Sequence, residues 1–241
     1  MKNIILTGVS KGLGIETART LLESGYSVYG ISRSETEELK ILKNKFPQHL
    51  KTLIFDLSDV ENVKNKIFVE FIPLSVPIHG FINNAALAYD DIITNINYDK
   101  LKSSFDVNFF APVMMTKYVI RNMIFNNIAG SIVHLSSISV HTGYKGLSMY
   151  AASKGALEAF SKNTAREWGS KKIRSNCVVA GFMETEMSAS LTSEQKDRIY
   201  KRTSLKEAVS VKSVASMIQF LVSNDANSVT GQNIFVDNGT I

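Results

Sequence analysis

Short apolar runs alternate with longer segments of helical periodicity along the whole chain. The apolar runs predict seven strands, at residues 3–8, 27–32, 51–56, 78–83, 131–136, 174–181 and 233–237. The segments between them predict helices at residues 13–24, 35–46, 59–71, 99–127, 149–168 and 211–223. Apolar strands that alternate with helices are typical of a parallel sheet covered on both faces. We therefore expect an α/β chain with a single-domain, doubly wound Rossmann fold and a seven-stranded, mainly parallel sheet over residues 1–241.

Residues 182–207 interrupt this alternation. The segment is rich in Met, Ser, Thr and charged residues, and it joins the sixth predicted strand to the last long helix. A connection of this length is unusual in a compact domain and is often functional. Because ligands of such sheets bind beyond the carboxyl ends of the strands, the segment is expected to form a substrate lid. The alternative is a solvated helical excursion without a role.

The composition narrows the functional classes. Of 241 residues, 44% are hydrophobic and 20% are charged, which is typical of a globular protein. The chain has neither a run of 18 apolar residues nor a signal peptide, so we expect a cytoplasmic protein without a membrane partner. The lone cysteine, Cys177, excludes an intrachain disulfide and is expected to be a buried core thiol. The four histidines are too dispersed for a local metal motif, and the net charge of +5 comes without the Lys/Arg blocks of a nucleic-acid surface.

A glycine-rich turn follows the first predicted strand. Gly8, Gly12 and Gly14 lie in "TGVSKGLG", between that strand and an amphipathic helix. Glycines in this context let the backbone approach a pyrophosphate, and the free N–H groups of the helix N-terminus favour an anion. The segment predicts a dinucleotide site, with an ordinary glycine-rich turn as the alternative.

The end of the second predicted strand indicates which dinucleotide binds. NAD-selective sites usually carry an acidic residue there, which accepts hydrogen bonds from the ribose hydroxyls. This chain has Ser32 and Arg33 instead, and Lys11 stands in the glycine-rich turn. Two cations without a carboxylate favour the 2′-phosphate of NADP(H). The alternative for Arg33 is a solvated side chain.

Tyr150 and Lys154 are four residues apart in a predicted helix, so their side chains leave the same face. Taken alone, this spacing is equally compatible with a surface tyrosine that packs on a lysine stem. The segments that surround it, however, match a known family. The chain resembles the short-chain dehydrogenase/reductases over essentially its full length, through "TGVSKGLG", "FDLSD", "NNAA", "DVNFFAP", "HLSSIS", "YAASK" and "AGFMET". Tyr150 follows Ser137, directly after the fifth predicted strand, by thirteen residues, which makes the pattern specific.

The resemblance implies a role for each matching residue. Tyr150 would protonate a ketone oxygen, and Lys154 would lower the pKa of Tyr150 and bind the nicotinamide ribose. Ser137 would hold the carbonyl oxygen, Asn108 would anchor a water chain that returns protons to the lysine, and Thr185 would contact the nicotinamide carboxamide or a phosphate. The implied cofactor-binding residues are Gly8, Ser10, Lys11, Gly12, Leu13, Gly14, Ser32, Arg33, Asp56, Leu57, Asn84, Tyr150, Lys154 and Thr185. Ser136 competes with Ser137, and a satisfied buried amide is the alternative for Asn108.

Two positions depart from the family pattern. Ala86 stands where the third motif usually has glycine, and its methyl group is expected to tighten the turn. Ala180 stands where the motif after the sixth strand usually has proline, and this loss is expected to loosen the root of the lid. Neither change touches an atom that reacts.

Within the family, the segments around the Tyr-Lys pair and the end of the chain are most similar to 3-oxoacyl-[acyl-carrier-protein] reductases. That similarity implies reduction of a 3-oxoacyl thioester, with Lys171, Lys172 and Arg174 as a basic patch for an acidic carrier protein. Ile128 stands where those reductases commonly carry arginine, so a free ketone, a sugar derivative and a polyketide-type intermediate stay open as substrates. Residues 138–147 are expected to line the substrate pocket, with His141 and Tyr144 in contact with the substrate.

Two expectations concern assembly and catalysis. Apolar residues of the long helices, among them Met114, Met115, Phe160 and Trp168, favour a homotetramer, with a dimer as the next alternative. Packing on the chain's own sheet would also explain them. An NADP-binding regulatory protein or an inactive partner subunit would require damage to the catalytic set, and that set is intact.

Overall fold

Seven strands form one parallel sheet in the computed structural model, which describes residues 1–188 and 191–241. Their order across the sheet is β3-β2-β1-β4-β5-β6-β7, and each adjacent pair is parallel. The predicted doubly wound sheet is confirmed, with each strand within two residues of its predicted bounds. The strands are β1 (Asn3–Thr7), β2 (Ser27–Ser32), β3 (Leu50–Ile54), β4 (Gly80–Asn83), β5 (Ser131–Ser137), β6 (Arg174–Ala180) and β7 (Asn233–Val236).

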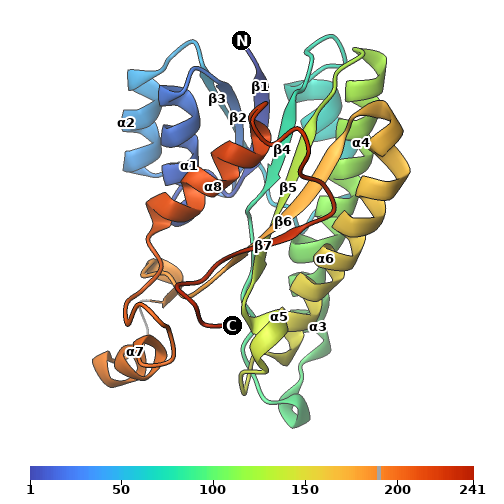
Figure 1. The fold of residues 1–241 in the computed structure, drawn as a ribbon. Helices are drawn as coiled ribbons and strands as arrows, with labels where there is room; N and C mark the ends of the chain where they lie inside the picture. The colour runs from blue at the N-terminus through green and yellow to red at the C-terminus, as the bar shows by residue number, and fades with distance from the viewer. Residues whose placement is uncertain (189–190) are drawn as a thin grey trace.

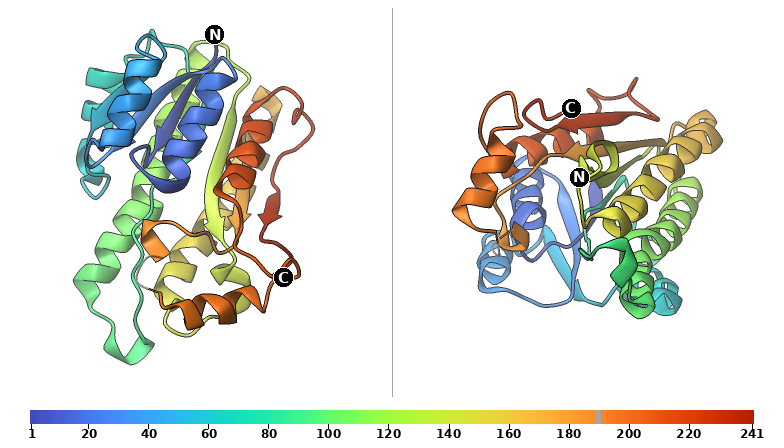
Figure 2. Two further views of the ribbon diagram at one scale, coloured as in Figure 1. Left: turned by 90° about the vertical axis from the view of Figure 1, so that its left-hand side faces the viewer. Right: turned by 90° about the horizontal axis from the view of Figure 1, so that it is seen from below.

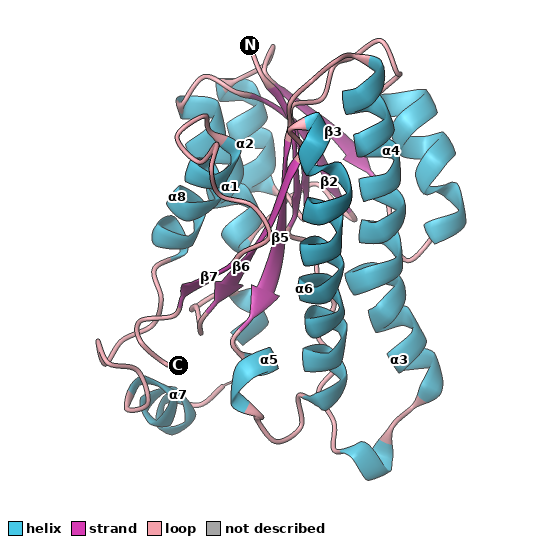
Figure 3. Ribbon diagram, turned by 45° about the vertical axis from the view of Figure 1, so that its right-hand side comes forward, coloured by secondary structure: helices cyan, strands magenta, loops and turns pink. Residues whose placement is uncertain are grey.

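Helices cover both faces of the sheet (Figures 1 and 3). One face carries α1 (Gly12–Glu23), α2 (Glu37–Lys45) and α8 (Val211–Val222), and the other carries α4 (Ala111–Phe125), α6 (Ser148–Trp168) and the π-helical segment Val63–Phe71. Side chains alternate along each strand, so Ile4 and Leu6 belong to the core beneath α1 and α8, whereas Ile5 belongs to the core beneath α4. Cys177 is fully buried, as predicted.

The predicted helix 99–127 is confirmed over Tyr98–Phe125, but its middle is not α-helical. The structure has α3 (Tyr98–Phe105), a π-helical segment Asp106–Phe110, and then α4. A π-helical turn is wider than an α-helical one, and such turns are frequent at functional sites. Here the wider turn carries Asn108, whose side chain bonds to the backbone of Leu87 on the segment after β4.

Two short helices at the carboxyl edge of the sheet were not predicted: α5 (Ser139–Thr142) and α7 (Ser193–Tyr200). Thr192 and Gln195 form a capping box at the start of α7, since each side chain bonds to the other's backbone N–H. In Figure 2 the orange segment with α7 lies at this same edge, beside the C-terminal segment. Residues 189–190 of the predicted lid lie outside the described residues.

The root of the predicted lid is firmly held. The Gly181 N–H donates to the Val236 carbonyl at 2.9 Å, and a Cβ on Gly181 would lie 2.7 Å from Asp237 Cα. Gly181 is thus packed closely against the end of β7, and the loosening expected from Ala180 stays a prediction. Ala86 is not among the non-glycine residues with positive φ in the described chain, so its backbone accepts the methyl group without strain.

Among the helices of residues 1–188 and 191–241, none is long and apolar enough to cross a membrane.

Candidate active site

The turn between β1 and α1 has a backbone that needs its glycines. Gly8 and Gly12 have φ of 72° and 55°, a region that favours glycine. A Cβ on Gly14 would lie 1.8 Å from the Gly8 carbonyl oxygen, so no side chain fits there. The Asn84 side chain, after β4, donates to the Thr7 carbonyl at 2.9 Å and the Gly8 carbonyl at 3.3 Å. The turn is thus a rigid cradle at a helix N-terminus, and it fits the pyrophosphate of a dinucleotide.

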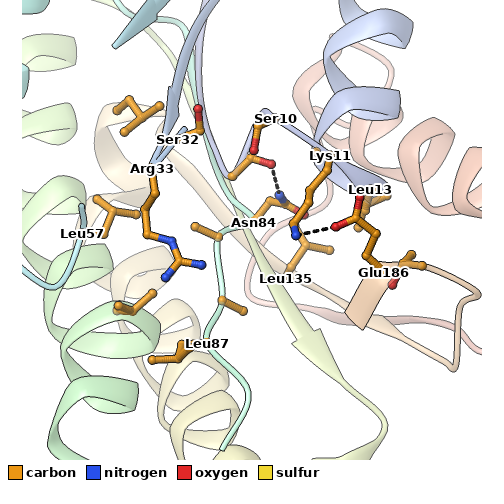
Figure 4. Close-up of a pocket in the computed structure, with 18 of the residues that line it drawn as sticks. Ser10, Lys11, Leu13, Ser32, Arg33, Leu57, Asn84, Leu87, Leu135 and Glu186 are labelled. Carbon is orange, nitrogen blue, oxygen red and sulfur yellow. Dashed lines mark hydrogen bonds and ion pairs between the residues drawn. The ribbon is translucent and has the colours of Figure 1, made fainter. Parts of the chain in front are cut away.

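One cavity runs from this cradle to Tyr150 and Lys154 on α6. Figure 4 shows part of its lining, with Ser10, Arg33 and Asn84 among the labelled side chains. It brings together residues from β1, β2, the ends of β3 and β4, α6 and the root of the predicted lid. All fourteen residues expected to bind the cofactor line it: Gly8, Ser10, Lys11, Gly12, Leu13, Gly14, Ser32, Arg33, Asp56, Leu57, Asn84, Tyr150, Lys154 and Thr185.

Lys11 and Arg33, the two cations expected to favour the 2′-phosphate of NADP(H), do not lie side by side. Figure 4 shows Arg33 and Lys11 on different sides of the cavity. The Lys11 Nζ donates to Glu186 at 2.6 Å, at the root of the lid, whereas Arg33 is exposed and lines the cavity beside the buried Ser32. Lys11 lines the cavity and forms an exposed ion pair with Glu186, and its contact with the cofactor stays a prediction. Arg33 keeps the position that suits a ribose phosphate.

Lys154 is buried, with 2% of its surface exposed. Its Nζ donates to the Leu135 carbonyl at 2.7 Å and lies 5.7 Å from the centroid of the Tyr150 ring. Burial lowers the pKa of Lys154 to about 8. The lysine thus reaches the Tyr150 ring, as the four-residue spacing predicts, but bonds to the end of β5.

The pKa of Tyr150 differs from the sequence-based expectation. Burial, together with the Asp90 carboxylate, raises the pKa of Tyr150 to about 12. We expected Lys154 to lower this pKa. In the structure the ammonium bonds to the Leu135 carbonyl, and desolvation of the phenolate dominates.

The two serines at the end of β5 have different partners. The Ser136 hydroxyl donates to the Glu158 carboxylate. Ser137 is half-buried, and its Oγ accepts a hydrogen bond from the Ser139 N–H at 3.2 Å. Because this bond uses a lone pair, the Ser137 hydroxyl proton stays free to donate to a carbonyl oxygen. Of the two serines, Ser136 lines the cavity and Ser137 does not, whereas Ser137 is the one whose hydroxyl proton is not used by a partner in the described chain. The choice of Ser137 over Ser136 stays a prediction.

Asn108 is fully buried and fully hydrogen-bonded. Its Oδ1 accepts from the Leu87 N–H at 2.8 Å, and its Nδ2 donates to the Leu87 carbonyl at 2.9 Å and to the Ser153 hydroxyl at 3.0 Å. The structure therefore corresponds to the satisfied buried amide. The side chain links the segment after β4 to α6, next to Lys154, instead of reaching the lysine itself.

The segment 138–147 does not line the cavity described above. The His141 Nε2 lies 3.1 Å from Glu158 Oε2, and its ring stacks edge-on against Phe235 at 4.9 Å. The Tyr144 ring lies 5.5 Å from the guanidinium of Arg202, which follows α7. The expected contact of His141 with substrate is thus corrected: the residue is held from inside by a carboxylate.

Sequence reasoning missed Glu158. A signal was present, because Tyr150, Lys154 and Glu158 repeat every four residues and share one helix face. A glutamate in a helix is usually solvated, however, and its burial depends on β7, whose Asn233 donates to it at 2.6 Å.

The basic patch proposed for a carrier protein is not formed as expected. Arg174 is buried, and its guanidinium donates to the Ser223 carbonyl at 3.1 Å and the Val229 carbonyl at 3.3 Å. Lys171 and Lys172 are exposed but precede β6, whereas the cavity lies at the other end of that strand, beside Ala180. The length of β6 separates the two ends by roughly 20 Å.

Several apolar residues offered as evidence of assembly pack on their own chain. Met114, Met115 and Trp168 belong to the core on the α4 side of the sheet. Phe160 packs edge-on against Phe109 at 6.2 Å and against His134 at 5.8 Å. The exposed apolar side chains on α4 are others: Ile124 and Phe125, with Phe110 just before the helix.

Comparisons with known proteins agree with this geometry. A family model described as enoyl-(acyl carrier protein) reductase matches residues 8–240. L-xylulose reductase from Caenorhabditis elegans is 32% identical over 240 residues, which cover 99% of this chain and 95% of the relative. A 3-oxoacyl-[acyl-carrier-protein] reductase from Salmonella typhimurium is 30% identical over 99% of this chain and 96% of its own length. Among solved structures, 4-hydroxyisoleucine dehydrogenase complexed with NADH is 27% identical, covers 100% of this chain and 98% of its own, and superposes with a TM-score of 0.93.

Proposed function

The chain belongs to the short-chain dehydrogenase/reductase family and is an oxidoreductase, and from this premise we propose that it reduces a ketone to a secondary alcohol with NADPH. One observation carries the proposal: a single cavity joins the glycine cradle to Tyr150 and Lys154. The family resemblance assigns the binding of a nicotinamide dinucleotide to the first and proton transfer to the second.

The cofactor would be held by residues from both ends of the cavity. The cradle of Gly8, Gly12 and Gly14 would take the pyrophosphate, and Arg33 would bind the 2′-phosphate that distinguishes NADPH from NADH. Thr185 packs against the cradle, since a Cβ on Gly12 would lie 3.7 Å from its side chain, and it would contact the nicotinamide end. When bound, NADPH supplies the hydride.

The protein's own groups would handle the oxygen of the carbonyl. Ser137 would donate its free hydroxyl proton to the oxygen and stabilise the negative charge that develops there. Tyr150 would donate the proton that completes the alcohol; its raised pKa keeps the phenol protonated at neutral pH. The Lys154 ammonium, held under the tyrosine ring by the Leu135 carbonyl, would stabilise the phenolate that remains.

The first substrate to test is a 3-oxoacyl thioester, because the 3-oxoacyl-[acyl-carrier-protein] reductase is similar over almost its full length. A second candidate is a small free ketone or sugar derivative. It is supported by the half-buried Ile128, which packs on the core, and by Arg174, whose guanidinium is occupied by backbone carbonyls. Neither residue offers a free cation to an acidic carrier protein.

The predicted lid and the assembly belong to the same proposal. Residues 182–207 would close over the substrate end, since their root at Thr185 and Glu186 lines the cavity. A homotetramer, with a dimer as the alternative, is supported by exposed apolar side chains on two surfaces. These are Phe110, Ile124 and Phe125 at α4, and Phe220, Phe235 and Ile241 at α8, β7 and the chain end.

The experiment is NADPH oxidation by the purified chain with acetoacetyl-CoA and with a panel of free ketones that includes L-xylulose. Tyr150→Phe should reduce turnover at least about 100-fold, because it removes the acid and leaves the ring. Tyr98→Phe, at a tyrosine that is 72% exposed, is the matched control and should change nothing. Unchanged turnover in Tyr150→Phe would refute the acid role. Turnover with free ketones alone would select the second substrate class.

A further inference from the structure

A buried carboxylate lies one helical turn beyond Lys154. Glu158 is 8% exposed and accepts hydrogen bonds on both oxygens. Oε1 accepts from the Ser136 hydroxyl, Oε2 accepts from Asn233 Nδ2 at 2.6 Å, and His141 Nε2 lies 3.2 and 3.1 Å from the two oxygens. Since a carboxylate only accepts, His141 Nε2 carries the proton in this pair. Burial of a carboxylate is unfavourable unless its oxygens accept hydrogen bonds, and here both oxygens do.

The three donors come from three separate elements that meet beside Ser137. Ser136 precedes Ser137 on β5, His141 belongs to α5, and Asn233 begins β7. Helix α5 also contacts β7 directly, because the His141 ring packs against the Phe235 ring with 4.9 Å between the ring centroids. Glu158 therefore ties β5, α5 and β7 to the helix that carries Tyr150 and Lys154.

Two of these ties lead to the Ser137 hydroxyl. Through Ser136, Glu158 fixes the strand position next to Ser137. Through His141, it holds α5, whose first residue, Ser139, donates its N–H to Ser137 Oγ at 3.2 Å. That bond occupies one lone pair of the Ser137 oxygen and so restricts the directions in which its proton can point.

We propose that Glu158 is a positioning residue for catalysis, which orients the Ser137 hydroxyl toward the carbonyl oxygen through Ser136 and through His141 on α5. The inference rests on the proposed role of Ser137. A hydrogen-bond donor stabilises developing charge only when it is held within about 0.5 Å of the productive position, which a floppy strand end cannot ensure. Neither Glu158 nor Ser137 is among the residues that line the cavity, whereas Ser136, which bonds to Glu158 and precedes Ser137, lines it. Glu158 is therefore proposed to act through these neighbours.

A double-mutant cycle between Glu158→Gln and Ser137→Ala tests this, with kcat and KM measured on the best substrate of the panel above. Glu158→Gln keeps the shape and weakens the bonds to Ser136 and His141. We expect kcat to fall about 10-fold, as for other supporting-shell changes, with the KM for NADPH unchanged. In the Ser137→Ala background the same substitution should cause no further loss, because the group that it positions is gone. Glu167→Gln, at an exposed glutamate on the same helix, is the matched control.

The outcomes separate this inference from the proposed function. If the fold-losses of kcat in the two single variants multiply in the double variant, Glu158 acts independently of Ser137. That result would overturn the inference and leave the proposed function standing. Full activity in Ser137→Ala would overturn the inference together with the proposed role of Ser137, and it would leave the proposed reduction of a ketone standing. If Glu158→Gln does not fold, judged by circular dichroism, His141→Gln enters the same cycle, since the His141 side chain is 28% exposed and tolerates change. We then expect His141→Gln to lower kcat in the parent background and to leave it unchanged in the Ser137→Ala background. Any other result would refute the inference.

Discussion

Replacing Lys154 by methionine is expected to stabilise the folded protein at pH 7 while abolishing turnover. The parent buries an ammonium group whose pKa falls from 10.5 to about 8 on folding. The folded state thus binds this proton more weakly than the unfolded chain does. Below about pH 8 the buried ammonium lowers the free energy of unfolding of the parent by its full amount. This cost disappears as the pH rises from about 8 to about 10.5.

The size of the effect follows from the shift. Two and a half pKa units correspond to about 3 kcal/mol of unfolding free energy at pH 7. By pH 9.5 the unfolded lysine has begun to lose its proton and the folded one has lost it, so roughly 2 kcal/mol of that cost disappears. Methionine also loses the hydrogen bond to the Leu135 carbonyl, but this loss does not depend on pH. The difference between parent and variant should therefore narrow by about 2 kcal/mol from pH 7 to pH 9.5.

Urea unfolding at pH 7.0, 8.0, 9.0 and 9.5, followed by circular dichroism, measures this difference. The range stops below the ordinary pKa of tyrosine, above which ionisation of Tyr150 in the unfolded chain would add a second effect of opposite sign. Lys162→Met, at an exposed lysine of α6, is the matched control and should show a constant difference from the parent. A constant difference for Lys154→Met as well would refute the claim that burial controls this lysine.

Three further predictions concern the cavity and the surface. Gly14→Ala should abolish NADPH binding measured by fluorescence titration, since its Cβ would meet the Gly8 carbonyl at 1.8 Å; Gly169→Ala, where nothing lies within 4 Å, should bind normally. Arg33→Ala should raise the KM for NADPH about 10-fold or more and leave that for NADH within about twofold, and an equal rise for both would contradict the phosphate role. Phe125→Glu, at a side chain that is 63% exposed, should shift the assembly toward smaller species in light scattering at constant fold, and an unchanged mass would exclude this surface.

The strand pattern and the glycine spacing were sufficient to predict the fold and the residues around the cavity. Both depend on local rules: alternating apolar strands and helices, and a turn in which Gly14 has no room for a side chain. The preference for Ser137 over Ser136 rests on the thirteen residues between Ser137 and Tyr150, and it stays a prediction because Ser136 is the one that lines the cavity.

What the sequence did not reveal depends on partners far along the chain. Whether the Asn108 amide is free or satisfied depends on Leu87, twenty-one residues earlier. The ion pair of Lys11 with Glu186, 175 residues later, likewise gives no sign in the sequence. The buried Glu158 bonds to Ser136, His141 and Asn233, and the last of these lies 75 residues later, so a glutamate in a helix gives no sign of this arrangement.

The strand order has a consequence for how the chain folds. β1 lies at the centre of the sheet, between β2 and β4, although it is the first strand to be synthesised. In its pairing with β4, Ile4 lies beside Gly80. One edge of β1 therefore stays unpaired until the chain has been synthesised at least as far as β4. Non-local pairing of this kind slows folding and exposes unpaired apolar strand edges on the way. Since the cavity combines residues from Gly8 to Glu186, a nascent chain gains binding ability only after most of the sheet is complete. We expect ligands of this cavity to protect the finished protein from unfolding without helping the early stages of its folding.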